Sequence, residues 1–190
     1  IKIKNIFITG NKILSDQEII EIAKISDYPS NLKNPSMVIK NRLLKNTYIK
    51  KVKVNKKRFN QLYINIEENR PIFYNSNIKK VILSNSDVVS DNFVVPILIN
   101  YVPDTIYNKF IEKMSEVEDS IINRMSEIKY NPNDVDDERF LVSMSDGNYV
   151  YLTLKSFSNI NEYINIIKNF NTKKGILYLD SGEYFQVFEN

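Results

Sequence analysis

The order of hydrophobic patterns in the first 70 residues limits the possible folds more than any other feature. Apolar and polar residues alternate over 1–8, which predicts a strand. Helical spacing follows over 15–25 and again over 34–46, and alternation returns over 51–55 and 62–67. The predicted order is strand, helix, helix, strand, strand. A three-stranded sheet with both helices on one face would bury both sets of apolar residues.

Capping signals support the two helices. Ser15 and Glu18 have the spacing of a capping box, in which the hydroxyl caps the helix and the carboxylate reaches back. For the second helix, Asn34 is the predicted cap, and Pro35 is predicted at the first position, where a missing N–H costs nothing.

After Pro71 the pattern becomes a mixture of short strands and helices. Strands are predicted at 72–74 and 80–83, and the apolar run 94–99 holds Pro96, which predicts an edge strand or a buried loop. Asp104 is predicted to cap a helix whose apolar residues have helical spacing up to Val117.

The remaining segments complete a second unit rich in strands. Residues 120–130 are predicted to be extended, and a hairpin is predicted around Asp146-Gly147. Further predictions are a helix over 160–170, a strand over 176–180 and a last strand over 184–188.

The charge distribution changes near Arg70-Pro71. Residues 1–70 carry 15 basic and 6 acidic side chains, whereas residues 71–190 carry 11 and 17. The net charges of +9 and −6 predict two domains, 1–70 and 71–190. A basic first domain fits an anionic partner such as nucleic acid, an acidic membrane surface or a wall polymer, and it also fits a plain solvated face.

Composition removes most catalytic chemistries. The chain has no Cys, His or Trp and only 4 Gly, so disulfides, Cys/His zinc sites, His-based triads and glycine-rich phosphate loops are excluded. The acidic loop 134–138 lacks the ligand spacing of a calcium loop. Any remaining catalysis would have to rest on carboxylates, Ser, Tyr or Lys, so the composition points away from an enzyme. We expect no enzyme activity, no cofactor, no metal and no small-molecule substrate.

The basic run 50–58, with Tyr48, Phe59 and Tyr63 nearby, has two interpretations. In the first interpretation the run binds nucleic acid: the lysines contact phosphates and the aromatic rings stack on bases. Alternatively, Lys51 and Lys53 lie on the solvent face of a strand and only discourage edge-to-edge pairing. The second interpretation is preferred because basic runs are weak motifs.

The C-terminal segment 184–188 is the strongest candidate for a binding site. It carries three aromatic residues in five positions. A terminal strand is often the edge of a sheet, and its unpaired N–H and C=O groups can bind a strand from another chain. The same side chains could instead simply fill the core, and the two interpretations are compatible.

Taken together, these sequence features resemble those of a known family. The first unit resembles a POTRA domain, with its strand order, the run 6–11 ending in Gly10-Asn11 and the capped helix after it. The second unit resembles the β domain of the FtsQ/DivIB cell-division proteins through 126–128, the 146–150 hairpin, the helix around 163–167 and the closing run 175–182. The resemblance implies an α+β fold: a POTRA domain over 1–70, then a mixed β domain over 71–190 with two helices packed on its sheet.

The resemblance also implies a function. Such proteins are non-enzymatic divisome scaffolds on the outer face of the plasma membrane that bind FtsB/DivIC-like and FtsL-like bitopic partners and regulate septal peptidoglycan synthesis. In the family the partner adds a strand near the last strand of the β domain. By position the partner-binding residues are Leu179, Asp180, Ser181, Gly182, Glu183, Tyr184, Phe185, Gln186, Val187 and Phe188.

Two further expectations complete this interpretation. The chain opens in a strand pattern at Ile1 rather than at Met, so we expect a piece of a longer protein whose N-terminal transmembrane anchor lies upstream. The alternatives are an outer-membrane assembly or secretion component with a POTRA domain, a basic nucleic-acid-binding protein, and a carboxylate-dependent hydrolase of the cell wall. The scaffold is preferred, with no nucleic acid among its partners.

Overall fold

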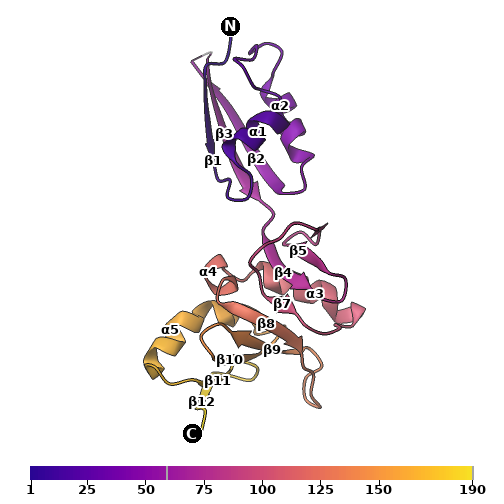
Figure 1. The fold of residues 1–190 in the computed structure, drawn as a ribbon, viewed down its shortest axis with the longest axis vertical. Coiled ribbons are helices and arrows are strands. Elements are labelled where there is room, and N and C mark those ends of the chain that lie inside the picture. Colours follow the sequence, from indigo (N-terminus) through magenta and orange to yellow (C-terminus); the bar gives the residue numbers. More distant parts are fainter. Residues whose placement is uncertain (59, 190) are drawn as a thin grey trace. The chain divides into compact units, whose positions relative to one another are not determined.

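A computed structural model describes residues 1–58 and 60–189, and Phe59 of the basic run lies outside them. The chain divides into two compact units, 1–70 and 71–190, each with its own hydrophobic core. Within the described residues no helix has the length and apolar character needed to cross a bilayer. Figure 1 gives the course of the chain.

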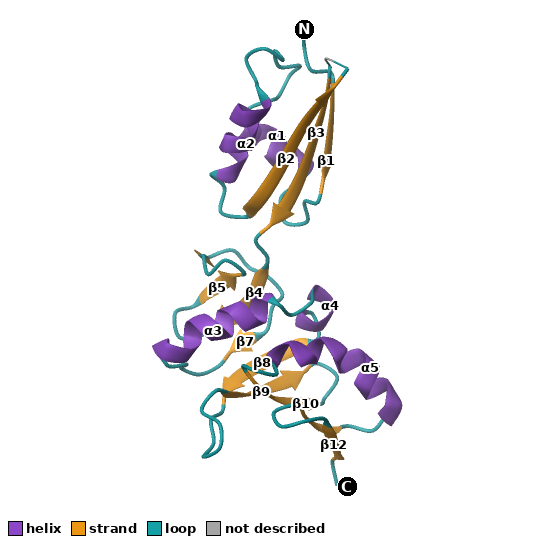
Figure 2. Cartoon of the chain, turned by 180° about the vertical axis from the view of Figure 1, so that it is seen from behind, coloured by secondary structure: helices purple, strands orange, loops and turns teal. Residues whose placement is uncertain are grey.

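Unit 1 (residues 1–70) is a three-stranded sheet with two helices on one face (Figure 2). Its elements follow the predicted order and are β1 (Asn5–Thr9), α1 (Asp16–Ala23), α2 (Ser36–Leu44), β2 (Ile49–Lys57) and β3 (Gln61–Glu68). The central strand β3 pairs parallel to β1 and antiparallel to β2. The fully buried side chains of Ile19, Ile39 and Leu62 join both helices to the sheet.

The two helix starts differ in how well capping signals located them. The predicted cap of α1 is confirmed, because the Glu18 N–H donates to the Ser15 hydroxyl oxygen over 3.1 Å. The predicted cap of α2 is wrong by one residue. Pro35 is the N-cap, and the side chain of Asn34 instead donates to the Ser30 carbonyl (2.7 Å) and accepts from Arg42 (2.8 Å). Asn34 is buried at this junction, so these tertiary bonds replace the local cap.

The loop between β1 and α1 is held by the last residue of β3, at the end of the sheet where the parallel strand β1 also ends. The Glu68 carboxylate accepts the backbone N–H groups of Lys12, Ile13 and Leu14. At the start of this loop Gly10 has φ +86°, and a Cβ there would lie 1.9 Å from the Ile66 carbonyl oxygen. The tight approach of the loop to β3 therefore requires glycine.

Unit 2 (residues 71–190) contains one nine-stranded sheet in the order β12-β11-β10-β9-β8-β7-β4-β5-β6. Its strands are β4 (Pro71–Asn75), β5 (Lys80–Leu83), β6 (Val88–Val89), β7 (Ile97–Leu98), β8 (Met125–Tyr130), β9 (Arg139–Met144), β10 (Tyr149–Thr153), β11 (Gly175–Tyr178) and β12 (Tyr184–Val187). Its helical segments are α3 (Asp104–Ser115), α4 (Asp119–Ile122), η1 (Phe157–Glu162), α5 (Tyr163–Ile167) and η2 (Lys168–Phe170).

One face of this sheet is covered by helices, as the fold class predicts. Phe110 of α3 stacks on Phe140 of β9 at 4.7 Å between ring centroids and contacts Phe73 and Phe157. Figure 2 shows α3 and α5 in front of the strands. The hairpin of β9 and β10 is confirmed, with Val150 opposite Val142.

Several predicted elements of unit 2 differ from the structure. The run 94–99 is not an edge, because β7 lies between β4 and β8 and pairs parallel to both; Pro96 precedes the strand and so removes no bond from it. The start of 120–130 belongs to the single turn α4. Pro103, rather than Asp104, is the N-cap of α3. The helix over 160–170 is interrupted, with 3-10 turns on both sides of α5.

Candidate functional site

The candidate site is the edge formed by β12. This strand pairs antiparallel with β11, Leu177 opposite Phe185 and Tyr178 opposite Tyr184, and it is the outermost strand of the sheet. The main-chain groups on its other side therefore face away from the sheet, as is usual for an edge strand.

Two hydrogen bonds identify which groups point outward. The Phe188 N–H donates to the Lys174 carbonyl (3.0 Å), and the Leu179 N–H donates to the Tyr151 carbonyl of β10 (2.9 Å). Main-chain groups alternate between the two sides of an antiparallel strand. The groups of Tyr184 and Gln186 therefore bond to β11, and those of Phe185 and Val187 point outward from the edge.

A hollow beside the edge lies on the helix-covered face. Phe185 packs against Phe170 of η2, with ring centroids 4.3 Å apart. The hollow has a volume of about 320 Å³ and opens between α5, η2 and the last two strands. Its lining is formed by Asn165, Ile166, Asn169, Phe170, Leu177, Glu183 and Phe185. A side chain of an added strand would enter it on the same face as Phe185.

The opposite face of the edge carries a row of aromatic rings. Tyr184 contacts Tyr178 at 5.9 Å between centroids, and Tyr178 stacks on Tyr151 of β10 at 5.3 Å. The Tyr178 hydroxyl is 3.2 Å from Gln186 Oε1, and Phe188 contacts Tyr149 edge-on at 6.0 Å. The helices described above lie on the other face of the sheet, and Tyr184 is 62% exposed.

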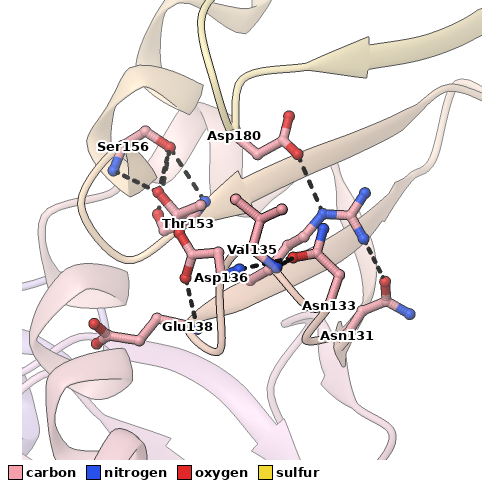
Figure 3. Close-up of polar contacts among 9 residues, drawn as sticks. Asn131, Asn133, Val135, Asp136, Glu138, Thr153, Ser156 and Asp180 are labelled. Atoms are coloured by element: carbon pink, nitrogen blue, oxygen red, sulfur yellow. Dashed lines mark hydrogen bonds and ion pairs between the residues drawn. The ribbon is translucent and has the colours of Figure 1, made fainter.

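The turn before β12 is fixed by an ion pair. Leu179 is buried, and Asp180 Oδ2 lies 3.2 Å from Nε of Arg139, whose guanidinium also covers the Tyr151 ring at 3.7 Å. Figure 3 shows this ion pair and the bond from Arg139 to Asn131. The second carboxylate oxygen, Asp180 Oδ1, is buried and has no hydrogen-bond partner among the described residues. Beside this anchored carboxylate, Ser181, Gly182 and Glu183 are exposed.

A buried asparagine anchors the strand next to the edge. Asn148 is fully buried; its Oδ1 accepts the Gly175 N–H (2.9 Å), and its Nδ2 donates to the Tyr163 hydroxyl (2.9 Å). The Tyr163 hydroxyl donates to Asp146 Oδ2 (2.5 Å), so the network joins α5, the β9–β10 turn and the start of β11. Burial, followed by the hydrogen bond to Asp146, raises the pKa of Tyr163. Sequence reasoning missed this network, since Asn after Asp-Gly is also an ordinary turn residue.

Glycine at the start of β11 allows β12 to approach. A Cβ on Gly175 would lie 2.0 Å from the Gln186 carbonyl oxygen and 2.9 Å from Val187 Cα. Because both atoms belong to the backbone of β12, no side-chain movement could relieve the overlap. Pairing of β11 with β12 therefore depends on glycine at position 175.

Residues 134–138, the acidic loop, are ordered by their own side chains. Asn133 Oδ1 accepts the N–H groups of Val135 and Asp136, and Asp136 Oδ1 accepts that of Glu138 (Figure 3). Over residues 1–58 and 60–189, no group of three or more acidic side chains is arranged to hold a metal ion. The loop is thus a set of local turns.

The basic run forms contacts within unit 1. Lys50 and Lys51 lie 3.3 and 3.9 Å from the Glu67 carboxylate, and Lys57 covers the Tyr63 ring at 4.5 Å. Lys56 donates to two backbone carbonyls in the loop before α2. These contacts favour the interpretation of the run as a solvated strand face over a nucleic-acid site.

Comparisons with known proteins found cell-division relatives. The family described as "POTRA domain, FtsQ-type" matches residues 1–69. The chain is 28% identical to the cell division protein DivIB of Bacillus subtilis, over 98% of this chain and 74% of that protein. It is 25% identical to DivIB of Listeria monocytogenes, over 98% of this chain and 73% of the relative.

A solved structure is also similar. The major extracytoplasmic domain of DivIB from Geobacillus stearothermophilus, in its trans isomer, aligns with 22% identity and a TM-score of 0.44. The alignment covers 53% of this chain and 92% of that domain.

Proposed function

We propose that the chain is a DivIB/FtsQ-type cell-division protein and acts as a non-enzymatic scaffold of the divisome, which its POTRA match and its similarity to DivIB proteins support. In this proposal it acts on the outer face of the plasma membrane at the division septum, held by a transmembrane anchor upstream of residue 1. Its partners are FtsB/DivIC-like and FtsL-like bitopic proteins. By holding them together it contributes to the regulation of septal peptidoglycan synthesis.

One observation carries the partner-binding part of the proposal. The edge of β12 directs the N–H and C=O groups of Phe185 and Val187 away from the sheet, beside a hollow lined by apolar and acidic side chains. A partner strand would form hydrogen bonds with these main-chain groups. Its side chains would point alternately into the hollow on one face and against the tyrosine row on the other, and this fit would give specificity.

An acidic group near the edge suggests the charge of the partner segment. Glu183 is exposed and borders the hollow, whereas the Asp180 carboxylate is held by Arg139. Glu183 favours a partner segment that carries Lys or Arg beside its apolar anchor, because charge-assisted bonds to carboxylates are the strong ones.

The test is an NMR titration of the isotope-labelled chain with soluble ectodomains of the candidate FtsB/DivIC-like and FtsL-like partners. We expect saturable shifts over 179–188. Val187→Pro removes an outward N–H but none of the bonds to β11, and should abolish those shifts while the rest of the spectrum is retained. Val187→Thr keeps both the N–H and the β-branched shape and should bind like the original chain.

Two results would contradict the proposal. Binding that survives Val187→Pro would show that the partner does not add a strand to this edge. Shifts confined to residues 48–63 would place the partner on unit 1 instead.

A further inference from the structure

Three segments of unit 1 meet at one end of its sheet: residues 1–4, the loop 27–34, and residues 56–58 with residue 60. Figure 1 shows this end beside the N-terminal residue. Backbone hydrogen bonds connect the segments: Ile3 N–H to Pro29 O (2.9 Å), Asn31 N–H to Ile1 O (3.0 Å) and Lys4 N–H to Asn60 O (2.8 Å). We call the surface formed by residues 1–4, 27–34, 56–58 and 60 the basic end.

The basic end concentrates positive charge. It contains one acidic residue, Asp27, and six basic ones, which are Lys2, Lys4, Lys33, Lys56, Lys57 and Arg58. Lys56 is directed inward, because its ammonium donates to the carbonyls of Asn31 (3.0 Å) and Asn34 (2.5 Å). The other five basic residues are exposed. The surface therefore presents a dense positive charge with little acidic compensation.

The same surface also presents apolar side chains to water. Leu32 is 90% exposed and Tyr28 is 64% exposed. Tyr28 and Asp27 both have left-handed backbone conformations, with φ of 52° and 56°, which are uncommon for residues other than glycine. The loop thus holds an aromatic and an aliphatic side chain outside the core, between lysines.

We propose that the basic end is a docking surface for an anionic lipid bilayer. Lysines near such a membrane are attracted by its negative surface potential. Tyrosine suits the level of the headgroups, and a leucine gains free energy by entering the boundary with the acyl chains. A soluble polyanion would attract the lysines equally well but would leave Leu32 in water, and the exposure of Leu32 therefore favours the bilayer.

This proposal does not depend on partner binding at β12. The basic end belongs to unit 1, and its charged and apolar residues are all distant in sequence from 179–188. If the strand-addition proposal fails, the membrane-docking proposal still stands. If the membrane-docking proposal fails, the strand-addition proposal still stands.

The absence of tryptophan in the chain permits a direct test. Leu32→Trp places a single indole at the basic end, where the native side chain is already exposed. Leu44→Trp is the matched control, since Leu44 is 40% exposed at the end of α2. Leu44 precedes the start of β2 at Ile49, and Ile49 lies roughly 27 Å along the strand from Lys57.

We expect the fluorescence of the Leu32→Trp chain to shift to the blue with vesicles of phosphatidylcholine and phosphatidylglycerol. Brominated lipids should quench this fluorescence, and vesicles of phosphatidylcholine alone should cause no change. The Leu44→Trp chain should not respond to either vesicle.

Charge variants measure the electrostatic part by vesicle co-sedimentation. Lys33→Glu and Lys57→Glu should each lower the apparent partition coefficient at least about fivefold at low salt. Lys45→Glu makes the same charge change beside Leu44 and should have a much smaller effect. Leu32→Ser should weaken binding at every salt concentration, because the apolar contribution is not screened.

Three outcomes would overturn the proposal. The first is no binding to anionic vesicles at low salt. The second is an equal loss of binding in the Lys45→Glu control. The third is vesicle binding that is abolished by soluble polyphosphate and is unchanged by Leu32→Ser. That result would show that the basic end binds polyanions in general.

Discussion

At the scale of single residues, the C-terminal edge depends on two positions outside the outward-facing groups of β12. Gly175 allows β12 to lie against β11, and Asn148 fixes the start of β11 by accepting its first N–H. Both residues act on the shape and position of the edge. Substitutions there should change partner binding without removing any group that a partner contacts.

The first residue-scale prediction concerns Gly175→Ala. The added methyl group would overlap the β12 backbone, so β12 should leave the sheet while the buried core residues of β9 and β10 stay in place. Hydrogen exchange measured by NMR should show lost protection over 184–188 and retained protection over 139–153. Gly182→Ala is the control, since a Cβ there meets no atom within 4 Å, although its φ of +133° adds some strain.

The second residue-scale prediction concerns alkaline pH. The pKa of Tyr163 is raised in the folded state, so the unfolded chain releases its proton at a lower pH than the folded chain does. The corresponding stability is fully present below pH 10 and is lost as pH rises above the ordinary tyrosine pKa of 10.0. Tyr163→Phe should lower the free energy of unfolding by about 1–3 kcal/mol at neutral pH through its lost hydrogen bonds.

The same variant should flatten the decline of stability above pH 10, measured by urea unfolding at a series of pH values. An unchanged slope would show that Tyr163 does not account for the decline. Tyr151→Phe is a matched tyrosine control, because its ring stacks on Tyr178 on the other face of the sheet.

At the scale of secondary-structure elements, local patterns predict the existence of most elements but not their neighbours. Alternation around Asp146-Gly147 is enough to predict the β9–β10 hairpin, because its contacts are close in sequence. It says nothing of β7, two residues long, which lies between β4 and β8. Pro96 suggested an edge because proline lacks an N–H, yet this proline stands one residue before the strand. Parallel pairing of β10 with β11 likewise depends on the intervening helical segment and not on periodicity.

Helix caps also show that local patterns do not predict tertiary contacts. Ser15 caps α1 as its sequence spacing predicts, whereas the side chain of Asn34 forms hydrogen bonds with Ser30 and Arg42 instead of capping α2. The edge position of β12 follows the expectation for the segment 184–188, but the outward direction of Phe185 and Val187 is decided by the register with β11. The hollow beside it depends on η2, which periodicity had assigned to a continuous helix.

A prediction at this scale concerns the loop that joins β1 to α1. Glu68→Ala removes the acceptor of three backbone N–H groups and should lower the free energy of unfolding of unit 1 by about 2–3 kcal/mol. Glu68→Gln keeps one carbonyl acceptor and should cost less. Urea unfolding followed by NMR signals of unit 1 measures both, and equal stability of all three chains would contradict the role of this carboxylate.

At the scale of the whole molecule, the described residues form two hydrophobic cores that share no buried residue. One core combines Ile19, Ile39 and Leu62 with their neighbours, and the other surrounds Phe110 and Phe140. Each unit therefore contains the buried apolar surface needed for its own cooperative folding.

We accordingly predict that fragments 1–70 and 71–190 each fold when expressed separately. In the whole chain, Leu62→Ala should lower the stability of unit 1 by about 2–5 kcal/mol and leave the unfolding of unit 2 unchanged. Residue-resolved hydrogen exchange distinguishes the two units. A uniform loss of protection over both would show that they unfold as one.

The shortness of the β12 edge has a consequence for assembly in the cell. Two outward-facing residues offer at most four main-chain hydrogen bonds, which at about 1 kcal/mol each correspond to dissociation constants near the millimolar range. Side chains in the hollow add to this, but the main-chain part alone cannot hold a freely diffusing partner. In the proposed function both proteins are anchored in one membrane, and this confinement would replace encounter in three dimensions by a high effective concentration in two. The number of scaffolds with a bound partner would then depend on how densely the division site is populated.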